Sequence, residues 1–261
     1  MISELHTSRA DATLIVTITG PDTRNALHPD MVAAAIEILS TAERDDSVRA
    51  IILTGAGQWF SSGTDLHHLT AIRAQDKAAQ IDSCNGLQAW IETVGNCTKP
   101  VVAAIEGVAA GSGLALALAC DLIVASQSVR FMTANGRIGL TPDCGLSWLL
   151  SRALPRQLAN EMLLAGGSMD AMRLHNAGLV NRVVADGAAL DTALSLTNDL
   201  AMLAPNVITA TKPLIAGAQD QSLAEHFLAE QHRFIESLQH SNAHEGLASF
   251  LKKRKPEFSS K

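Results

Sequence analysis

The sequence of 261 residues contains no tyrosine, and aromatic side chains make up only 3% of it. It has no run of 18 or more apolar residues, which is the length that a membrane-spanning helix needs. Residues 1–20 lack the basic start and apolar stretch of a secretion signal. These absences predict a cytoplasmic protein with no membrane anchor.

Positive charge is also scarce, because the net charge is −6. Proteins that bind nucleic acids or anionic membranes need an excess of Lys and Arg, so the sequence argues against both as partners. One local exception is the run of basic residues at 252–255 (KKRK). This run predicts either a solvated tail or a contact with a phosphorylated ligand.

The four cysteines are spaced irregularly, and no two of them form a C-x-x-C pair. This spacing lacks the usual signatures of a zinc site and of a redox-active dithiol. We therefore expect reduced, mostly buried thiols and no metal site.

Short apolar strands alternate with helical patterns over the first half of the chain. Pro29 predicts the start of a helix whose apolar residues continue over 31–42, and a second helix is expected at 114–119. Strands are predicted at 13–19, 49–53, 101–105 and 122–125. This alternation predicts an α/β core with parallel strand pairing.

The pattern becomes mainly helical beyond Thr141. Pro142 and Pro155 predict helix starts, Gly178 predicts a stop, and only Val180–Val184 is strand-like. We expect this second half to continue the same structural unit, because no linker separates it from the first.

The C-terminal part has a helix signature of its own. Residues 242–245 (NAHE) have the spacing of a capping box, which predicts a last helix ending near Arg254. We assign residues 1–200 to the α/β core and residues 201–261 to a helical C-terminal region of the same functional unit.

Two glycine-bearing junctions follow predicted strands, at 59–65 (WFSSGTD) and 106–114 (EGVAAGSGL). Small residues let a ligand approach the main chain, and N–H groups that open a helix favour negative charge. The almost purely apolar helix after the second junction is expected to be buried. Neither junction contains the dinucleotide-binding or phosphate-loop pattern, and Ser112 does not lie in a G-x-S-x-G elbow. Such junctions are also common as simple tight turns.

Several segments resemble, in order and spacing, the signatures of the crotonase (enoyl-CoA hydratase/isomerase) superfamily. They are RNAL at 24–27, FSSGTDL at 60–66, AIEGVAAGSG at 104–113, ACDL at 119–122, IGLTPD at 138–143 and FLKKRKPEF at 250–258. The resemblance spans nearly the whole chain. It implies an α/β spiral of β-β-α turns with a helical C-terminal region that mediates homotrimers or dimers of trimers. It also implies a coenzyme A thioester as substrate, with no separate cofactor.

In this family, two main-chain N–H groups stabilise the enolate oxyanion of the thioester, and the matching residues here are Ser62 and Ser112. Each donor contributes about 3 kcal/mol in the transition state, and neither serine is assigned as a nucleophile. Phe250 and Lys253 are expected to reach the coenzyme A of a neighbouring subunit. The resemblance implies contacts with the coenzyme A ester at Arg24, Ala26, Ser61, Gly63, Thr64, Asp65, Leu66, Gly111, Phe250 and Lys253.

Hydratases of the family use two glutamates, and the matching positions here are Ala115 and Asn135. Neither side chain exchanges a proton at neutral pH, which argues against hydration by a carboxylate pair. The remaining acid in this region is Asp143, in a segment (GLTPDCG) that resembles family isomerases. We therefore predict a double-bond isomerase in which Asp143 carries the proton.

Other readings stay open for Asp143. With Thr141 as a cap and Pro142 at the first helical position, Asp143 would simply complement a helix dipole. A hydratase or acyl-CoA hydrolase that activates water with Asp143 or His67 is a second alternative, and a catalytically silent acyl-CoA-binding protein is a third. His67 and His68 are expected either near the acyl pocket or, as the simpler reading, on an exposed helix surface.

Three further acids near the motifs are assigned no proton-transfer role. Asp65 and Asp121 lie at element junctions, where capping or turn hydrogen bonds are the expected contacts. Glu106 is the residue before the glycines of the second junction, where many relatives carry asparagine.

Overall fold

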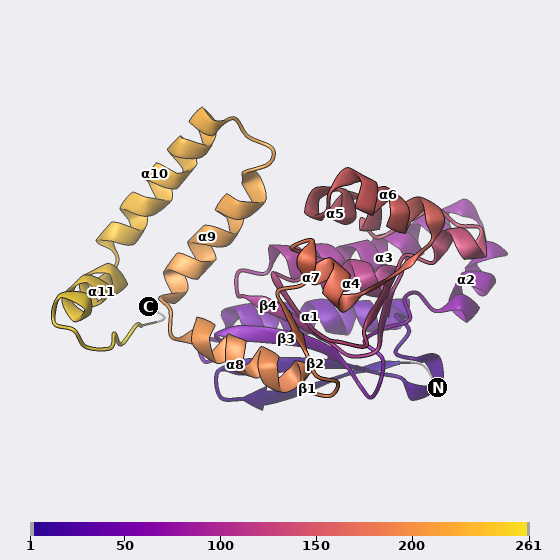
Figure 1. Ribbon diagram of the computed structural model, residues 1–261, viewed down its shortest axis with the longest axis horizontal. Helices are drawn as coiled ribbons and strands as arrows, with labels where there is room; N and C mark the ends of the chain where they lie inside the picture. Colours follow the sequence, from indigo (N-terminus) through magenta and orange to yellow (C-terminus); the bar gives the residue numbers. More distant parts are fainter. Residues whose placement is uncertain (1–2, 260–261) are drawn as a thin grey trace.

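The computed structural model describes residues 3–259 and contains a six-stranded sheet with the order β1-β2-β3-β4-β6-β9 (Figure 1). β1 and β2 are antiparallel, and all other neighbours in this sheet are parallel. The parallel pairing predicted from the sequence is therefore confirmed. The bounds are Glu4–Ala10 (β1), Thr13–Thr19 (β2), Ala50–Gly55 (β3), Val101–Ile105 (β4), Leu122–Ser126 (β6) and Arg182–Val184 (β9).

A second sheet consists of three short strands. β5 (Val108–Ala110) is parallel to β7 (Arg130–Met132), which is antiparallel to β8 (Ser168–Asp170). Since α4 (Ser112–Ala119) follows β5, the elements β4, β5 and α4 form one strand-strand-helix turn. β6, β7 and the 3-10 helix η3 (Asn135–Ile138) repeat this order, as expected for a spiral of β-β-α turns.

The helices of the first half of the chain lie on one side of the six-stranded sheet (Figure 1). The 3-10 helix η2 (Pro29–Met31) leads into α1 (Val32–Arg44), so Pro29 opens a helix as predicted. α2 (Leu66–Arg73) begins directly after the first glycine junction, and α3 (Lys77–Asn96) packs against α1 and α4. The sequence did not predict α3, because its buried residues occupy only its second half: Leu87, Trp90, Ile91 and Val94.

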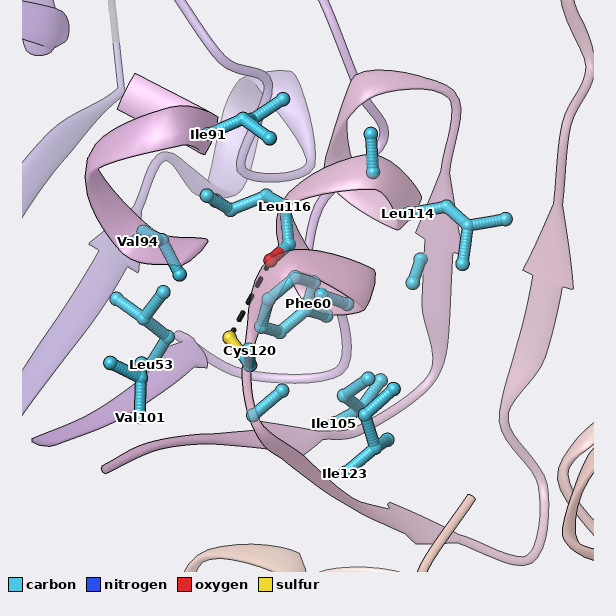
Figure 2. Packing of buried hydrophobic residues seen from close by; sticks show 14 of the residues in the cluster. Leu53, Phe60, Ile91, Val94, Val101, Ile105, Leu114, Leu116, Cys120 and Ile123 are labelled. Carbon is cyan, nitrogen blue, oxygen red and sulfur yellow. Dashed lines mark hydrogen bonds between the residues drawn. The ribbon is translucent and has the colours of Figure 1, made fainter. Parts of the chain in front are cut away.

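Helix α4 lies at the centre of the hydrophobic core. Its residues 112–117 are buried, which confirms the prediction made from its apolar composition. In Figure 2, Leu114 and Leu116 lie among side chains of β3, α3, β4 and β6, and the Cys120 thiol donates a hydrogen bond to the Leu116 carbonyl at 3.5 Å. The N-terminus of α4 is therefore surrounded by closely packed side chains.

Helix α5 (Leu146–Ala153) begins at Leu146 rather than at Pro142. Cys144 and Gly145 have φ angles of 53° and 73°, which a right-handed helix does not accommodate. The prediction that Pro142 opens a helix is therefore wrong, and Asp143 lies in the loop before α5.

The next two helices follow the sequence prediction more closely. α6 (Arg156–Ala165) begins directly after Pro155, and α7 (Ala171–Asn176) ends before Gly178, whose φ is 86°. α8 (Ala189–Ala201) then packs against β2, β3, β4 and β6 and covers the other side of the large sheet from α1 and α3 (Figure 1).

Three helices form a C-terminal arm that extends away from the sheet (Figure 1). They are α9 (Pro205–Gly217), α10 (Leu223–Gln239) and α11 (Ser241–Leu251). The helical character predicted for this region is confirmed, while its separation from the core at residue 200 stays a prediction.

The helix caps of the arm differ from the sequence prediction. His240 caps α11, because its ring Nδ1 accepts the Asn242 N–H at 3.1 Å. Asn242 is 3% exposed, and its side chain bonds the backbone of Ser259 instead of capping a helix. The capping box predicted at 242–245 is therefore wrong, and a capping box is present at Ser222 and Glu225 in α10.

A partly buried ion pair connects the arm with the core. The Lys212 ammonium group donates to the Asp121 carboxylate at 2.5 Å and to the Lys99 carbonyl at 3.1 Å. Asp121 also accepts the Val101 N–H at 2.7 Å. Asp121 thus has the structural role predicted from its position.

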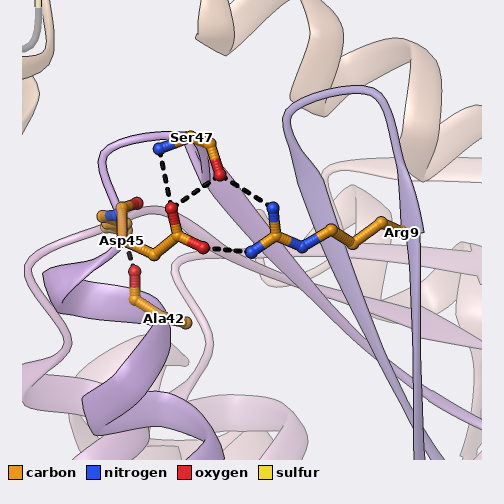
Figure 3. Close-up of polar contacts among 5 residues, drawn as sticks. Arg9, Ala42, Asp45 and Ser47 are labelled. Carbon is orange, nitrogen blue, oxygen red and sulfur yellow. Dashed lines mark hydrogen bonds and ion pairs between the residues drawn. The ribbon is translucent and has the colours of Figure 1, made fainter.

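A polar cluster connects the β1–β2 hairpin to the turn after α1 (Figure 3). Arg9 forms an ion pair with Asp45 and donates to the Ser47 hydroxyl at 2.7 Å. Ser47 donates its hydroxyl and its N–H to Asp45 at 2.6 and 2.9 Å. These hydrogen bonds, from Ser47 first and Arg9 second, lower the pKa of Asp45 to about 2. The cluster therefore keeps its charge over the ordinary pH range.

Within residues 3–259, no helix is long and apolar enough to cross a bilayer, and no cluster of His, Cys, Asp and Glu is arranged to hold a metal ion. All four cysteines are free thiols, and Cys97, Cys120 and Cys144 are buried, as expected. Burial raises the pKa of Cys97 to about 11, so this thiol stays protonated at neutral pH.

The Glu245 carboxylate organises the chain after α11. It accepts hydrogen bonds from the Arg254 guanidinium at 2.5 and 2.7 Å and from the Glu257 N–H at 2.9 Å. These bonds, from Arg254 first, lower the pKa of Glu245 to about 2. A lowered carboxylate pKa stabilises the fold above the ordinary carboxylate pKa, and this contribution is lost as the pH falls toward about 2.

We expect Glu245→Gln to expose the backbone of residues 252–259 at neutral pH, because the neutral amide cannot form the ion pair with Arg254. Amide hydrogen exchange, scaled to intrinsic rates, measures this opening. In the wild type the same residues lose protection only as the pH falls toward about 2. Amides of β4 report any global unfolding, and equal protection of 252–259 in both proteins at neutral pH would contradict the prediction.

Candidate active site

The two glycine-bearing junctions lie side by side. Phe60 and Ser61 both direct their N–H groups at the Val108 carbonyl, at 3.1 Å, and the Ala110 N–H returns to the Ser61 carbonyl at 3.0 Å. The contact continues into α4, since a Cβ added at Gly113 would lie 2.7 Å from the Ser61 Cβ. Two segments far apart in the sequence therefore touch through their main chains.

Gly63 and Ser112 face each other across this contact. Gly63 has a φ of 90°, and a Cβ there would lie 2.6 Å from the Ala110 carbonyl oxygen and 3.4 Å from the Ser112 nitrogen. Gly111, with φ 51° and ψ −124°, turns the chain from β5 into α4, so Ser112 opens the helix and its N–H has no acceptor within it. The Ser112 hydroxyl is bonded to the Thr64 hydroxyl at 2.8 Å. The main-chain N–H is therefore the group that Ser112 can offer to an oxyanion.

Ser62, the predicted source of the second donor, lies next to Gly63 at the same junction. Its N–H is directed at the Arg24 carbonyl oxygen at 3.0 Å, and its hydroxyl donates to the Thr23 carbonyl at 3.0 Å. A ligand oxygen at this N–H therefore has to share the hydrogen with the Arg24 carbonyl or displace that carbonyl.

The side chain of Asn25 holds the Arg24 loop against the first junction. It is 1% exposed, accepts a backbone N–H at 2.9 Å, and donates to the carbonyls of Ala56 and Trp59 at 2.9 and 2.6 Å. Arg24 and Asn25 have left-handed φ angles of 57° and 56°. The Arg24 guanidinium lies over the Trp59 ring, 5.0 Å from its centroid, and Ala26 is buried. No local sequence pattern indicates this role of Asn25, because its two acceptors lie 31 and 34 residues away in the chain.

We expect Asn25→Ala to lower the free energy of unfolding by about 2 kcal/mol, because it leaves buried backbone groups without partners. Urea unfolding followed by tryptophan fluorescence measures the change. Asn198→Ala, at an exposed position of α8, is the matched control and should change stability by less than about 0.5 kcal/mol. A loss no larger than that of the control would mean that other contacts fix the loop.

Asp143 is partly buried in the loop between η3 and α5. Its Oδ1 lies 3.5 Å from the Asn135 Nδ2, and its carbonyl accepts the Leu146 N–H at 2.9 Å. Because α5 begins at Leu146, Asp143 does not lie in a helical first turn, and the helix-capping alternative is wrong. The positive φ of Cys144 puts backbone strain next to this carboxylate, a feature that clusters at functional sites.

The Cys144 thiol is poorly suited to act as a nucleophile here. Burial and, second, the charge of Asp143 raise the pKa of Cys144 far above its ordinary value. Because the thiolate is the reactive form of cysteine, the thiol stays unreactive at neutral pH.

Ala115 and Asn135, which match the hydratase glutamates, lie in different elements. Ala115 is fully buried in α4, and Asn135 opens η3 beside Asp143. Of these three residues, only Asp143 can exchange a proton.

Comparison with known proteins decides the family. Residues 9–261 match the family model "Enoyl-CoA hydratase/isomerase". The chain belongs to this family. It is 32% identical over 257 residues to a 2,3-dehydroadipyl-CoA hydratase of Escherichia coli K12, covering 98% of this chain and 99% of the relative. It is also 32% identical to the 1,2-epoxyphenylacetyl-CoA isomerase of the same organism, covering 95% of each chain.

Solved structures of the hydratase/isomerase family share the fold. The crystal structure of an enoyl-CoA hydratase from Polaromonas sp. JS666 superposes with a TM-score of 0.96 at 42% identity, covering 98% of this chain and 100% of that chain. The predicted crotonase-like spiral with a helical C-terminal region is therefore confirmed.

Two predicted contacts of this family member lie on the C-terminal arm. Phe250 is 84% exposed near the end of α11, and Lys253, just beyond it, has a left-handed φ of 53°. Figure 1 places α11, which carries Phe250, and α2, which follows the first glycine junction, at opposite ends of the molecule. The contact of Phe250 and Lys253 with coenzyme A on a neighbouring subunit stays a prediction.

Two acids near the signatures, Asp65 and Glu106, have structural contacts, and Leu66 lies next to one of them. Asp65 caps α2 by accepting the His68 N–H at 2.9 Å, as expected, and Leu66 opens this helix with 57% of its surface exposed. Glu106 accepts the N–H groups of Gly187 and Ala189 at 3.1 Å. Glu106 thereby stabilises the start of α8, and Asp65 the start of α2.

The two histidines of α2 differ in their surroundings. His67 is exposed, whereas the His68 Nε2 is bonded to the Ser83 hydroxyl of α3 at 2.8 Å. The His68 ring also contacts the His28 ring, with 5.0 Å between the centroids. His68 thus connects α2 with α3 and with the loop before η2, a contact for which the sequence carries no signal.

Proposed function

We propose that this chain is an enoyl-CoA isomerase that moves a double bond with a single carboxylate, that of Asp143. The observation that supports this proposal most is the position of Asp143 in a strained loop next to Asn135. Ala115 and Asn135 stand where hydratases of the family are expected to carry glutamates, so a pair of carboxylates is missing.

In the proposed reaction, Asp143 removes a proton from the carbon between the thioester and the double bond of a 3-enoyl-CoA. The electron pair delocalises onto the adjacent thioester oxygen and, in conjugation with the double bond, forms a dienolate. Asp143 then returns the proton to the far end of the allylic system, which leaves the double bond conjugated with the thioester. Such acid and base catalysis contributes about 10²- to 10⁴-fold.

The N–H groups of Ser112 and Ser62 are the proposed donors to the dienolate oxygen. Ser112 opens α4, and Ser62 releases or shares the hydrogen bond that it makes with the Arg24 carbonyl. A dry, preorganised pair of donors contributes about 3 kcal/mol per donor to the transition state. The proposed contacts with the rest of the coenzyme A ester are those of Arg24, Ala26, Ser61, Gly63, Thr64, Asp65, Leu66 and Gly111, with Phe250 and Lys253 supplied by a neighbouring subunit.

The proposed assembly is a homotrimer or a dimer of trimers. Large apolar side chains cover the C-terminal arm, and such surfaces mark protein contacts. Light scattering of the purified protein gives the mass of the assembly. The most exposed of these side chains on the arm are Ile215, Leu223, Leu228, Phe234, Phe250 and Leu251.

Hydration is the second candidate function. A relative at 32% identity is a 2,3-dehydroadipyl-CoA hydratase, and Asp143 alone would have to activate the water. This candidate predicts addition of water to a 2-enoyl-CoA instead of a shift of the double bond.

The experiment that separates these candidates is incubation with trans-3-enoyl-CoA in D₂O. Ultraviolet absorbance follows the conjugated product, and mass spectrometry follows deuterium and added water. Conversion to the conjugated product with no added water supports isomerisation, and deuterium at the allylic carbons measures how far the Asp143 proton exchanges with solvent before it is returned. Addition of water, or release of free coenzyme A, would replace this proposal with a hydratase or a hydrolase, and binding without any conversion would replace it with a silent acyl-CoA-binding protein.

A further inference from the structure

The backbone of Asn135 is fixed on both sides. Its N–H donates to the Thr133 carbonyl at 2.6 Å, and its carbonyl accepts the Leu140 N–H at 3.1 Å. Ala134 before it and Gly139 after it both have left-handed φ angles, of 50° and 73°. The direction of the Asn135 side chain is therefore set by the η3 turn.

The orientation of the Asn135 amide is also determined. Its Nδ2 lies 3.2 Å from the Thr141 carbonyl oxygen and 3.5 Å from the Asp143 Oδ1. Both partners are acceptors, so rotating the amide by half a turn would bring three oxygens together. The NH₂ group therefore has to face Asp143.

This orientation leaves the other end of the amide without a partner. The Asn135 Oδ1 is buried and accepts no hydrogen bond within the part of the chain that the structure describes. A buried acceptor without a donor is unfavourable and calls for an explanation. The amide orientation that leaves this oxygen without a donor is the one that points the Asn135 N–H at the Asp143 carboxylate.

We infer that Asn135 is a positioning residue for Asp143. Its N–H faces the Oδ1 of the carboxylate, and the buried Cys144 thiol is the titratable group that also hydrogen-bonds Asp143. Asp143, oriented by these contacts, takes the proton from the substrate carbon and returns it. This inference rests on the proposed isomerisation. It also gives a reason for an amide at this position: a glutamate would compete for the proton and repel Asp143, whereas an apolar side chain would donate nothing.

Isomerisation by the wild type is measured first, and then its pH–rate profile is compared with those of Asn135→Leu, Asn135→Gln and the exposed control Asn198→Leu. Asn135→Leu removes the donor at similar size. We expect its maximal rate to fall about tenfold with little change in KM. The acid limb of the profile should move to higher pH, because the ionised carboxylate has lost a stabilising donor.

Asn135→Gln, which keeps the donor, should move the acid limb back toward its wild-type position. A purely structural role predicts a different result, because a loosened η3 lowers the rate equally at every pH. A rate loss without movement of the acid limb would overturn the inference.

A second measurement separates this inference from the proposed function. Carboxyl ¹³C NMR of the unliganded protein, with the Asp143 signal assigned by its loss in Asp143→Asn, follows the titration without any substrate. The Asp143 midpoint should move to higher pH in Asn135→Leu and stay in place in Asn198→Leu. If the wild type converts no 3-enoyl-CoA, the proposed function fails, and the NMR shift still decides whether Asn135 holds Asp143. An unmoved midpoint would overturn the inference.

Discussion

Replacing Asp143 with asparagine should lower the rate of double-bond isomerisation by about 10²- to 10⁴-fold, because the amide cannot carry a proton between two carbons. The side chains have nearly the same size, and Asp143 contributes no helix cap, so the fold should be unaffected. Single-turnover reaction of trans-3-enoyl-CoA in D₂O measures the effect through ultraviolet absorbance and deuterium content.

Asp191→Asn, on the exposed surface of α8, is the matched control for the loss of one carboxylate. It should leave the rate unchanged. Binding of the coenzyme A ester to Asp143→Asn should stay within a few-fold of the wild type, which separates loss of chemistry from loss of the site. Equal rates for the Asp143 variant and the wild type would exclude Asp143 as the proton carrier.

Gly63→Ala should damage stability and the site together. The left-handed φ of 90° costs an alanine about 1–2 kcal/mol, and the new Cβ would lie 2.6 Å from the Ala110 carbonyl oxygen. Because backbone has to move on one side or the other, we expect a total loss of at least about 3 kcal/mol in the free energy of unfolding. The Ser112 nitrogen, 3.4 Å from the added carbon, is at ordinary contact distance, so it moves only if the Ala110 backbone beside it moves.

Gly178→Ala measures the cost of backbone strain at a positive φ without a steric clash of the added Cβ. Gly178 has a similar φ of 86°, but a Cβ there meets no atom within 4 Å. Chemical unfolding of this variant should therefore show only the strain, about 1–2 kcal/mol, with catalysis unchanged. Similar losses in both variants would mean that the two junctions can separate freely, which would argue against a preorganised site.

The elements that the sequence predicts well are those whose signals are local. The strand at Thr13–Thr19 is a β-branched run that ends at Gly20 and Pro21, and the structure has the same bounds for β2. The strand at Val101–Ile105 is a short apolar run after Pro100, and apolar residues on all sides of α4 predict a buried helix there.

The features that the sequence does not predict depend on distant contacts. Cys144 adopts a left-handed φ that its residue type does not favour, so the Thr-Pro-Asp pattern before it gave a false helix start. Asn242 has the spacing of a cap, yet its amide bonds Asn206 and the C-terminal tail instead. Capping spacing is a local signal, and here a tertiary contact overrides it.

The candidate site shows the same division. The family signatures identified the two junctions and Asp143, because those residues lie in ordered motifs. The Ser62 N–H was expected to be a donor to the ligand, and no pattern in the sequence indicates that the Arg24 carbonyl accepts it at 3.0 Å. The sequence shows only that Asn135 stands where hydratases of the family carry a glutamate. Its contact with Asp143 follows from the geometry of the η3 turn.

The hydrogen bond between the Ser62 N–H and the Arg24 carbonyl has a consequence for selectivity between the bound states of the proposed reaction. A neutral thioester oxygen is a weaker hydrogen-bond acceptor than a peptide carbonyl, so exchanging the Arg24 carbonyl for it adds nothing to the affinity for substrate or product. A dienolate oxygen carries developing negative charge and forms a stronger bond with the same N–H. The Ser62 N–H therefore contributes little to the binding of substrate and product and more to the stabilisation of the intermediate, and such a difference is what accelerates turnover.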